Sequence, residues 1–197
     1  DDDLSRGLGD VYKRQHMDSW DVGQGAHDDA GGCIAAWRAV TLIKELGLRP
    51  RRTLRVVLWT NEENGSRGSR NYRNEHLNEL ENHILAIESD GGVFAPQGFG
   101  FTGNKEARKV VYDIADLLDP IGAGKITNWG RAPDIAILND EGVPVMSLNV
   151  DNSKYFWYHH TSADTFDKVD YGEFNDCIAA MAIMAYVVAD MEQRLPR

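Results

Sequence analysis

Residues 16–32, HMDSWDVGQGAHDDAGG, determine how the rest of the chain is interpreted. They contain His16, Asp18 two residues later, and the pair Asp28-Asp29 directly before a helical pattern. Histidine and carboxylate ligands suit a borderline-soft divalent cation, above all zinc. In such sites a carboxylate commonly binds the second ring nitrogen of a metal-bound histidine, and Asp18 is placed for that role. The alternative is a polar loop over a helix N-terminus, so the downstream residues must decide between the two interpretations.

The composition is that of one globular domain. The chain has 197 residues, of which 42% are hydrophobic and 26% charged, enough to bury a sizeable core. Its net charge of −10 argues against a nucleic-acid partner and is compatible with bound cations. No apolar run reaches membrane-spanning length, so we expect no membrane partner. Cys33 and Cys177 are expected to be buried hydrophobes, with a disulfide as the open alternative.

Residues 1–15 carry neither strand alternation nor a helical stripe. In α/β enzymes a metal ligand usually follows a strand, yet no hydrophobic strand pattern precedes His16. We therefore expect residues 1–15 to be a non-native or disordered tail, with a cloning-derived scar and a disordered native segment as the two explanations. Residues 16–197 would then be the C-terminal part of a catalytic domain whose first strands are missing.

Helix and strand patterns alternate along the remaining chain. Helices are predicted at residues 31–46, 66–80, 105–118 and 174–195, and buried strands at 53–60, 83–88 and 143–150. Residues 93–103 are typical of a loop or edge strand, and residues 121–134 of a loop. The first helix should turn an apolar stripe inward, made of Ile34, Trp37, Ala39, Val40 and Ile43. The alternation predicts a three-layer α/β/α fold with a mainly parallel central sheet.

Acidic or histidine clusters follow three of the predicted strands. They are Glu62-Glu63, Asp90 and the pair His159-His160. Because this architecture places its sites at the carboxyl ends of strands, these side chains are expected to converge.

Two divalent ions need about six to eight donors, including a bridging carboxylate. His16 and Asp90 could serve one ion, and Glu63 with one histidine of the pair the other, with Asp28 between them. Without metal the same residues would form a crowded group of carboxylates that repel one another. A metal centre explains that crowding better than a structural role does.

The neighbouring glutamates offer the division of labour that hydrolysis requires. One carboxylate binds an ion while the other, Glu62, takes a proton from the attacking water. A solvated helix start is the alternative for the glutamate pair, and a capped loop is the alternative for the segment after His160.

The loop at residues 128–134, NWGRAPD, supplies candidates for holding the charged ends of a short peptide. Arg131 could pair with a free carboxylate and Asp134 with a free amine, with Trp129 as a neighbouring contact. Each of the two charges could equally be a solvated loop residue.

Four motifs together resemble the two-zinc aminopeptidase and dipeptidase superfamily, most closely its carboxypeptidase Q (plasma glutamate carboxypeptidase) group. They are HMDSWDVGQGAHDDAGG, WTNEENGSRGS, ESDGG and YHHTSADTFDKVD, and the likeness covers essentially all of residues 16–197. The resemblance implies two zinc ions, with the ligands His16, Asp28 (bridging), Glu63, Asp90 and His160. It also implies that Glu62 is the general base, that Asp18 orients His16, and that His159 donates a hydrogen bond to the tetrahedral intermediate.

The function implied by this resemblance is a zinc-dependent exopeptidase that hydrolyses short peptides or dipeptides through a metal-bridging hydroxide. The resemblance further implies an extracellular or periplasmic location and, for the full-length protein, a homodimer. Two alternatives stay open: a catalytically silent binding domain of the same fold, and a glutaminyl cyclase-like transferase with one zinc. The complete ligand set and Glu62 argue against the first alternative, and the complete two-metal set argues against the second.

Overall fold

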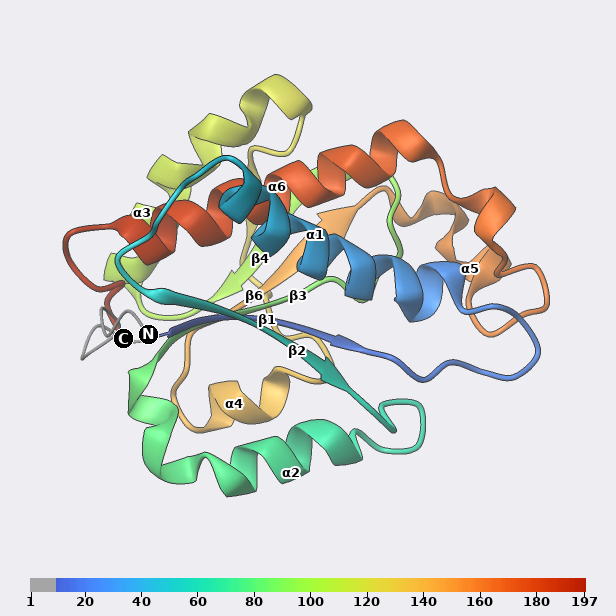
Figure 1. The fold of residues 1–197 in the computed structure, drawn as a ribbon, viewed down its shortest axis with the longest axis horizontal. Coiled ribbons are helices and arrows are strands. Elements are labelled where there is room, and N and C mark those ends of the chain that lie inside the picture. Colours follow the sequence, from blue (N-terminus) through green and yellow to red (C-terminus); the bar gives the residue numbers. More distant parts are fainter. Residues whose placement is uncertain (1–9) are drawn as a thin grey trace.

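The computed structural model describes residues 10–197 and shows a β-sheet between two layers of helices (Figure 1). The strands are β1 (Asp10–His16), β2 (Thr53–Trp59), β3 (His83–Glu88), β4 (Pro96–Thr102), β5 (Lys125–Thr127) and β6 (Val145–Val150). The helices are α1 (Gly31–Glu45), α2 (Arg67–Glu75), α3 (Lys105–Ala115), α4 (Ala136–Asp140), α5 (Tyr155–Tyr158) and α6 (Tyr171–Asp190). The predicted three-layer α/β fold is confirmed.

The strand order is β2-β1-β3-β6-β4-β5. Strands β1, β2, β3 and β6 are parallel, whereas β4 runs antiparallel to β6, and β5 runs parallel to β4. The carboxyl ends of the four parallel strands therefore share one edge of the sheet with the amino ends of β4 and β5. Helices α1, α3 and α6 cover one face of the sheet, and α2 and α4 cover the other (Figure 1).

Strand β1 corrects the expectation for residues 1–15. Residues 10–15 form most of this strand, which pairs with β2 on one side and with β3 on the other. Val11 and Gln15 are completely buried. A central strand exchanges backbone hydrogen bonds with two neighbours, which holds a segment whose apolar alternation is weak. His16 thus follows a strand after all, and residues 1–9 lie outside the described part of the chain.

Two other strands differ from their predicted burial. β2 lies at the edge of the sheet, where Leu58 is 42% exposed, although its apolar run predicted a buried strand. β4 was expected to be a loop or edge strand but lies between β6 and β5, with Phe99 and Phe101 completely buried. Its glycines explain the difference: a Cβ on Gly100 would lie 1.8 Å from the Trp129 carbonyl oxygen, so only glycine lets that loop pack on the strand.

The predicted stripe of helix α1 is buried only in part. Ala39 and Ile43 are buried as predicted, and so is Ala36, whereas Ile34 and Trp37 are about half exposed. The alanines allow α1 to lie close beside the alanine-rich α6, with which it packs extensively. The alanine side of α1 therefore faces α6, because only small side chains permit the two helices to lie this close.

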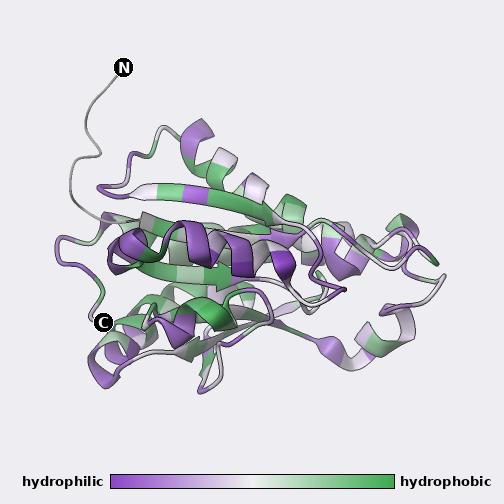
Figure 2. Ribbon diagram, turned by 90° about the horizontal axis from the view of Figure 1, so that it is seen from below, coloured by the Kyte–Doolittle hydropathy of each residue, from purple (hydrophilic) through white to green (hydrophobic). Residues whose placement is uncertain are grey.

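Helix α6 is the main core helix. It has 20 residues and is apolar enough to match a membrane span by length and composition, contrary to the expectation from the sequence. Half of its apolar stretch is buried inside the protein, where the helix packs against α1 and the sheet. This burial is that of a core helix. Figure 2 shows the same separation, with green strands in the interior and purple residues on the outer surfaces of the helices.

The loops on the site edge of the sheet are held close to it. Gly32 at the start of α1 illustrates how tight this region is, because a Cβ there would lie 2.2 Å from both the Asp29 carboxylate and the Ser89 carbonyl. Glycine therefore lets the start of α1 approach the ends of β1 and β3. Both cysteines are buried and free, as predicted.

Candidate metal and catalytic site

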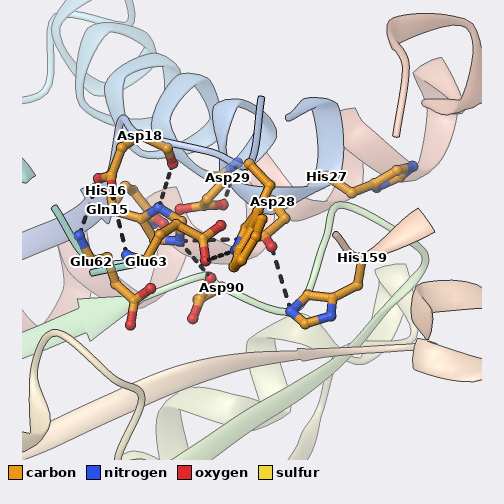
Figure 3. Close-up of polar contacts among 12 residues, drawn as sticks. Gln15, His16, Asp18, His27, Asp28, Asp29, Glu62, Glu63, Asp90 and His159 are labelled. Carbon is orange, nitrogen blue, oxygen red and sulfur yellow. Dashed lines mark hydrogen bonds and ion pairs between the residues drawn. The ribbon is translucent and has the colours of Figure 1, made fainter. Parts of the chain in front are cut away.

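The predicted site residues converge at the carboxyl edge of the parallel strands. His16 is the last residue of β1, Glu62 and Glu63 follow β2, and Asp90 lies two residues after β3. Asp28 comes from the irregular turn Ala26–Ala30 before α1, and the histidine pair follows α5. In Figure 3 the carboxylates of Asp28 and Asp90 point toward His16, and His159 approaches Asp28 from the opposite side.

Asp28 lies between two histidine rings. Its Oδ1 atom is 3.3 Å from His16 Nε2, and its Oδ2 atom is 3.2 Å from His160 Nε2. His16 Nε2 is also 3.0 Å from Asp90 Oδ1, and His160 Nε2 is 2.9 Å from Glu63 Oε2. The five predicted metal ligands therefore form one continuous chain of contacts with Asp28 at its centre.

Two groups of potential ligand atoms, which add Asp29 and His159 to these residues, lie at the site. One is formed by His16, Asp29 and Asp90, and the other by Asp28, His159 and His160, each with its ligand atoms within 4.8 Å of one another. The His159 ring stacks on the His160 ring with 3.7 Å between centroids, and His159 Nε2 is 3.5 Å from Asp28 Oδ2. The donor set thus has room for two cations, with Asp28 facing both.

The electrostatics of the site favour positive charge. Burial lowers the pKa of His16, but its contacts with the Asp28 and Asp90 carboxylates outweigh burial and raise that pKa far above its ordinary value. Burial also raises the pKa of Asp90 and Glu63. Asp28 Oδ2 and Glu63 Oε1 are buried, and neither accepts a hydrogen bond in the described residues. Divalent cations would satisfy these oxygens and offset the carboxylate repulsion, so the residues fit a metal.

Glu62 lies beside the ligand cluster with a shifted pKa. Burial raises the pKa of its carboxyl to about 7, and the nearby Asp90 and Asp134 carboxylates add to the shift, while His16 opposes it. A carboxyl with a pKa near neutrality can both take and release a proton at physiological pH. This fits the predicted role of a general base.

Asp18 has a different contact from the one predicted. The main-chain carbonyl of Asp18, not its carboxylate, accepts the hydrogen bond from His16 Nδ1, at 2.8 Å. The Asp18 carboxylate instead accepts hydrogen bonds from the backbone N–H groups of Glu62 (3.1 Å) and Glu63 (3.3 Å). Asp18 therefore orients the first histidine through its backbone and positions the glutamate pair through its side chain.

Two residues support the site through contacts that the sequence did not predict. Asp164 is almost completely buried and accepts hydrogen bonds from the backbone N–H groups of His27 and Asp28. Trp20 donates from Nε1 to Glu63 Oε2 at 2.7 Å, and its ring lies 5.1 Å from that of His160. The sequence signal for Asp164 was its place four residues after His160, which also fits an ordinary capped loop.

The predicted peptide-end clamp is not supported by the geometry. Arg131 donates to Asn139 (2.7 Å) and Asp140 (2.8 Å) on α4, which occupies its guanidinium. Asp134 is completely buried, so its carboxylate is not open to a substrate amine. Trp129 is 68% exposed on the loop after β5, and its contact with substrate stays a prediction.

Comparisons with known proteins show the family and the fold. The model of peptidase family M28 matches residues 11–185. Carboxypeptidase Q from Xenopus laevis is 48% identical over 182 residues, which cover 92% of this chain and 39% of that protein. The crystal structure of a peptidase M28 precursor from Shewanella amazonensis superposes with a TM-score of 0.92 at 35% identity, covering 98% of this chain and 45% of that one.

A more distant structure shares the fold. The zinc aminopeptidase of Bacillus subtilis has a TM-score of 0.69 at 17% identity, over 95% of this chain and 50% of that chain. This chain therefore spans about 40–50% of the length of these relatives.

Proposed function

Because this chain belongs to peptidase family M28, we propose that it carries the metal site of a zinc-dependent exopeptidase that hydrolyses short peptides, with Glu62 as general base. The observation that carries the proposal is the position of Asp28 between His16 and His160, in a cluster whose buried oxygens call for cations. Zinc is proposed because histidine and carboxylate ligands suit it, and because a fold relative is a zinc aminopeptidase.

In the proposed arrangement, His16 and Asp90 hold one ion and Glu63 and His160 hold the other, with Asp28 shared. Two bound zinc ions would act as Lewis acids that polarise the scissile carbonyl and make water more acidic. His159, which lies beside His160 and Asp28, would donate a hydrogen bond to the oxygen of the carbonyl under attack.

Glu62 supplies the proton transfers. Its carboxylate accepts a proton from the attacking water as the new C–O bond forms, then delivers a proton to the leaving amide nitrogen as the C–N bond breaks. None of the predicted site residues is a serine or cysteine that could act as nucleophile. Water therefore attacks the carbonyl carbon directly, and no covalent intermediate with the protein forms. Asp18 keeps Glu62 in place by binding its backbone N–H.

The test is hydrolysis of a dipeptide by the zinc-loaded full-length protein, compared with its acetylated and amidated forms and with chelator-treated protein. We expect cleavage of the free dipeptide, loss of activity with chelator, and restoration by zinc. Cyclisation of an N-terminal glutamine without hydrolysis would instead identify the transferase alternative. Absence of any turnover by fully zinc-loaded protein would support the silent binding domain. The extracellular or periplasmic location and the homodimer belong to the same proposal, and gel filtration of the full-length protein tests the latter.

A further inference from the structure

A polar cavity borders the metal site on the side of β4, β5 and β6. It has a volume of about 260 Å³, and its polar lining comes from Gln97, Lys125, Thr127, Asn149 and Asn152. Gly91, the residue after the metal ligand Asp90, also lines it. This set of residues is called the Lys125 cavity below.

The topology explains why the cavity lies next to the site. Lys125 begins β5 and Gln97 lies near the start of β4, while Asn149 lies near the end of β6. Because β4 and β5 run opposite to β6, these positions share the edge of the sheet where β3 delivers Asp90 (Figure 1). Gly91 lines the cavity and directly follows Asp90 in the sequence, so the cavity lies beside the loop that carries this proposed ligand.

The charge of the cavity is opposite to that of the protein. The chain has a net charge of −10, yet no acidic residue lines this cavity. Lys125 has no ion-pair partner among residues 10–197. Asn149 Nδ2 donates to Thr127 Oγ1 at 3.1 Å, which leaves the Thr127 hydroxyl proton available to another acceptor. The cavity thus offers one ammonium group and several amide and hydroxyl donors, which suits a carboxylate.

We propose that the Lys125 cavity is the subsite that binds a carboxylate of the peptide substrate, with Lys125 as its cationic contact. This inference rests on the proposed peptidase function. The smallest typical ligand pockets have a volume of about 300 Å³. The Lys125 cavity is slightly smaller, which suits one amino-acid residue of a peptide. The bound carboxylate is either the free C-terminus of the substrate or an acidic side chain next to the scissile bond. Lys125 thereby takes the role that Arg131 cannot fill, because the Arg131 guanidinium is bound to Asn139 and Asp140 of α4.

The experiment measures kcat/KM of the zinc-loaded full-length protein on Ala-Ala, Ala-Glu, Ala-Gln and Ala-Lys, each with a free and an amidated C-terminus. The variants are Lys125→Gln, the charge reversal Lys125→Glu, and Lys44→Gln as control, because Lys44 is an exposed lysine in the last turn of α1, far along the helix from the site. We expect Lys125→Gln to lower kcat/KM about 10- to 100-fold on the carboxylate-dependent substrates, the effect of losing a charged hydrogen bond. Ala-Gln amide should change by less than about twofold.

The pattern of losses identifies the source of the carboxylate. A Lys125→Gln loss on Ala-Ala that disappears on its amide points to the C-terminus, whereas a loss on the amide of Ala-Glu points to the side chain. Lys125→Glu should reverse the preference, so that Ala-Lys amide is cleaved faster than by the wild type. The subsite is overturned if wild type hydrolyses these peptides but Lys125→Gln matches Lys44→Gln on all of them. If the wild type hydrolyses none, the proposed function is overturned and the subsite with it.

Discussion

The carboxylate of Asp164 holds the backbone of Asp28. Asp164 Oδ2 accepts the N–H of Asp28 at 3.1 Å, and its Oδ1 accepts the N–H of His27 at 2.8 Å. The Asp164 carbonyl also accepts the N–H of Gln24 at 2.8 Å. The loop that carries His160 is thus fastened to the turn that carries the proposed bridging ligand.

We therefore expect Asp164→Asn to weaken zinc binding about 10- to 100-fold, as replacing a residue that orients a metal ligand usually does. The side-chain amide of this variant would turn its N–H₂ group toward one of the two backbone N–H groups, of His27 or Asp28, and that hydrogen bond would be lost. Zinc affinity measured by competition with a chromogenic chelator checks this. Asp167→Asn, an exposed residue of the same loop, is the matched control. Equal zinc affinity of Asp164→Asn and the wild type would show that the contact does not position Asp28.

Glu62→Gln should separate proton transfer from metal binding. The substitution keeps the size of the side chain and the backbone contact with Asp18, but removes the proton acceptor. We expect a fall in kcat of about 100-fold or more with zinc content unchanged. Single-turnover kinetics and metal analysis on the same sample check this. Loss of zinc along with activity would mean that Glu62 is a ligand and not the base.

Asp134 provides a pH-dependent test of stability in the metal-free protein. Burial raises its pKa from 3.8 to about 6, although the nearby Ser69 hydroxyl and His16 lower it. Since the folded pKa lies above the unfolded pKa, the folded state binds the proton more tightly. Stability should therefore fall as the pH rises from about 4 through 6.

Asp134→Asn should accordingly stabilise the metal-free protein by roughly 1–3 kcal/mol at pH 8 and have little effect near pH 4. Urea unfolding at both pH values measures the difference. Asp113→Asn, on the exposed side of α3, is the control. An equal effect of Asp134→Asn at both pH values would contradict the raised pKa.

The convergence of Glu62 and Asp90 could be predicted because each follows a predicted strand, and the carboxyl ends of parallel strands meet at one edge of the sheet. His16 was assigned from its motif alone, since no strand pattern was visible before it. Contacts made by backbone atoms were not predictable, since the carbonyl of Asp18 and the N–H of Asp28 have no signature in side-chain type. Asp164 depended on such a contact.

The fold predictions were weakest where strand pairing or close helix packing decided the structure and the pattern of apolar residues did not. β1 is fixed by its two neighbouring strands, although residues 10–15 show no clear strand alternation. In α1 the pattern pointed Trp37 inward, but the close contact with α6 selects the alanine face. The helix predicted at residues 105–118 ends early at Ala115, and Leu117 is 55% exposed in the 3₁₀ turn Asp116–Ile121 that follows.

The central claim is a two-metal site shared through Asp28. Its most direct test is the crystal structure of the zinc-loaded full-length protein, with anomalous difference maps calculated from diffraction data collected above and below the zinc absorption edge. We predict two zinc peaks about 3.5–4 Å apart, each within bonding distance of a different carboxylate oxygen of Asp28. A single peak, or two peaks that do not share Asp28, would contradict the account.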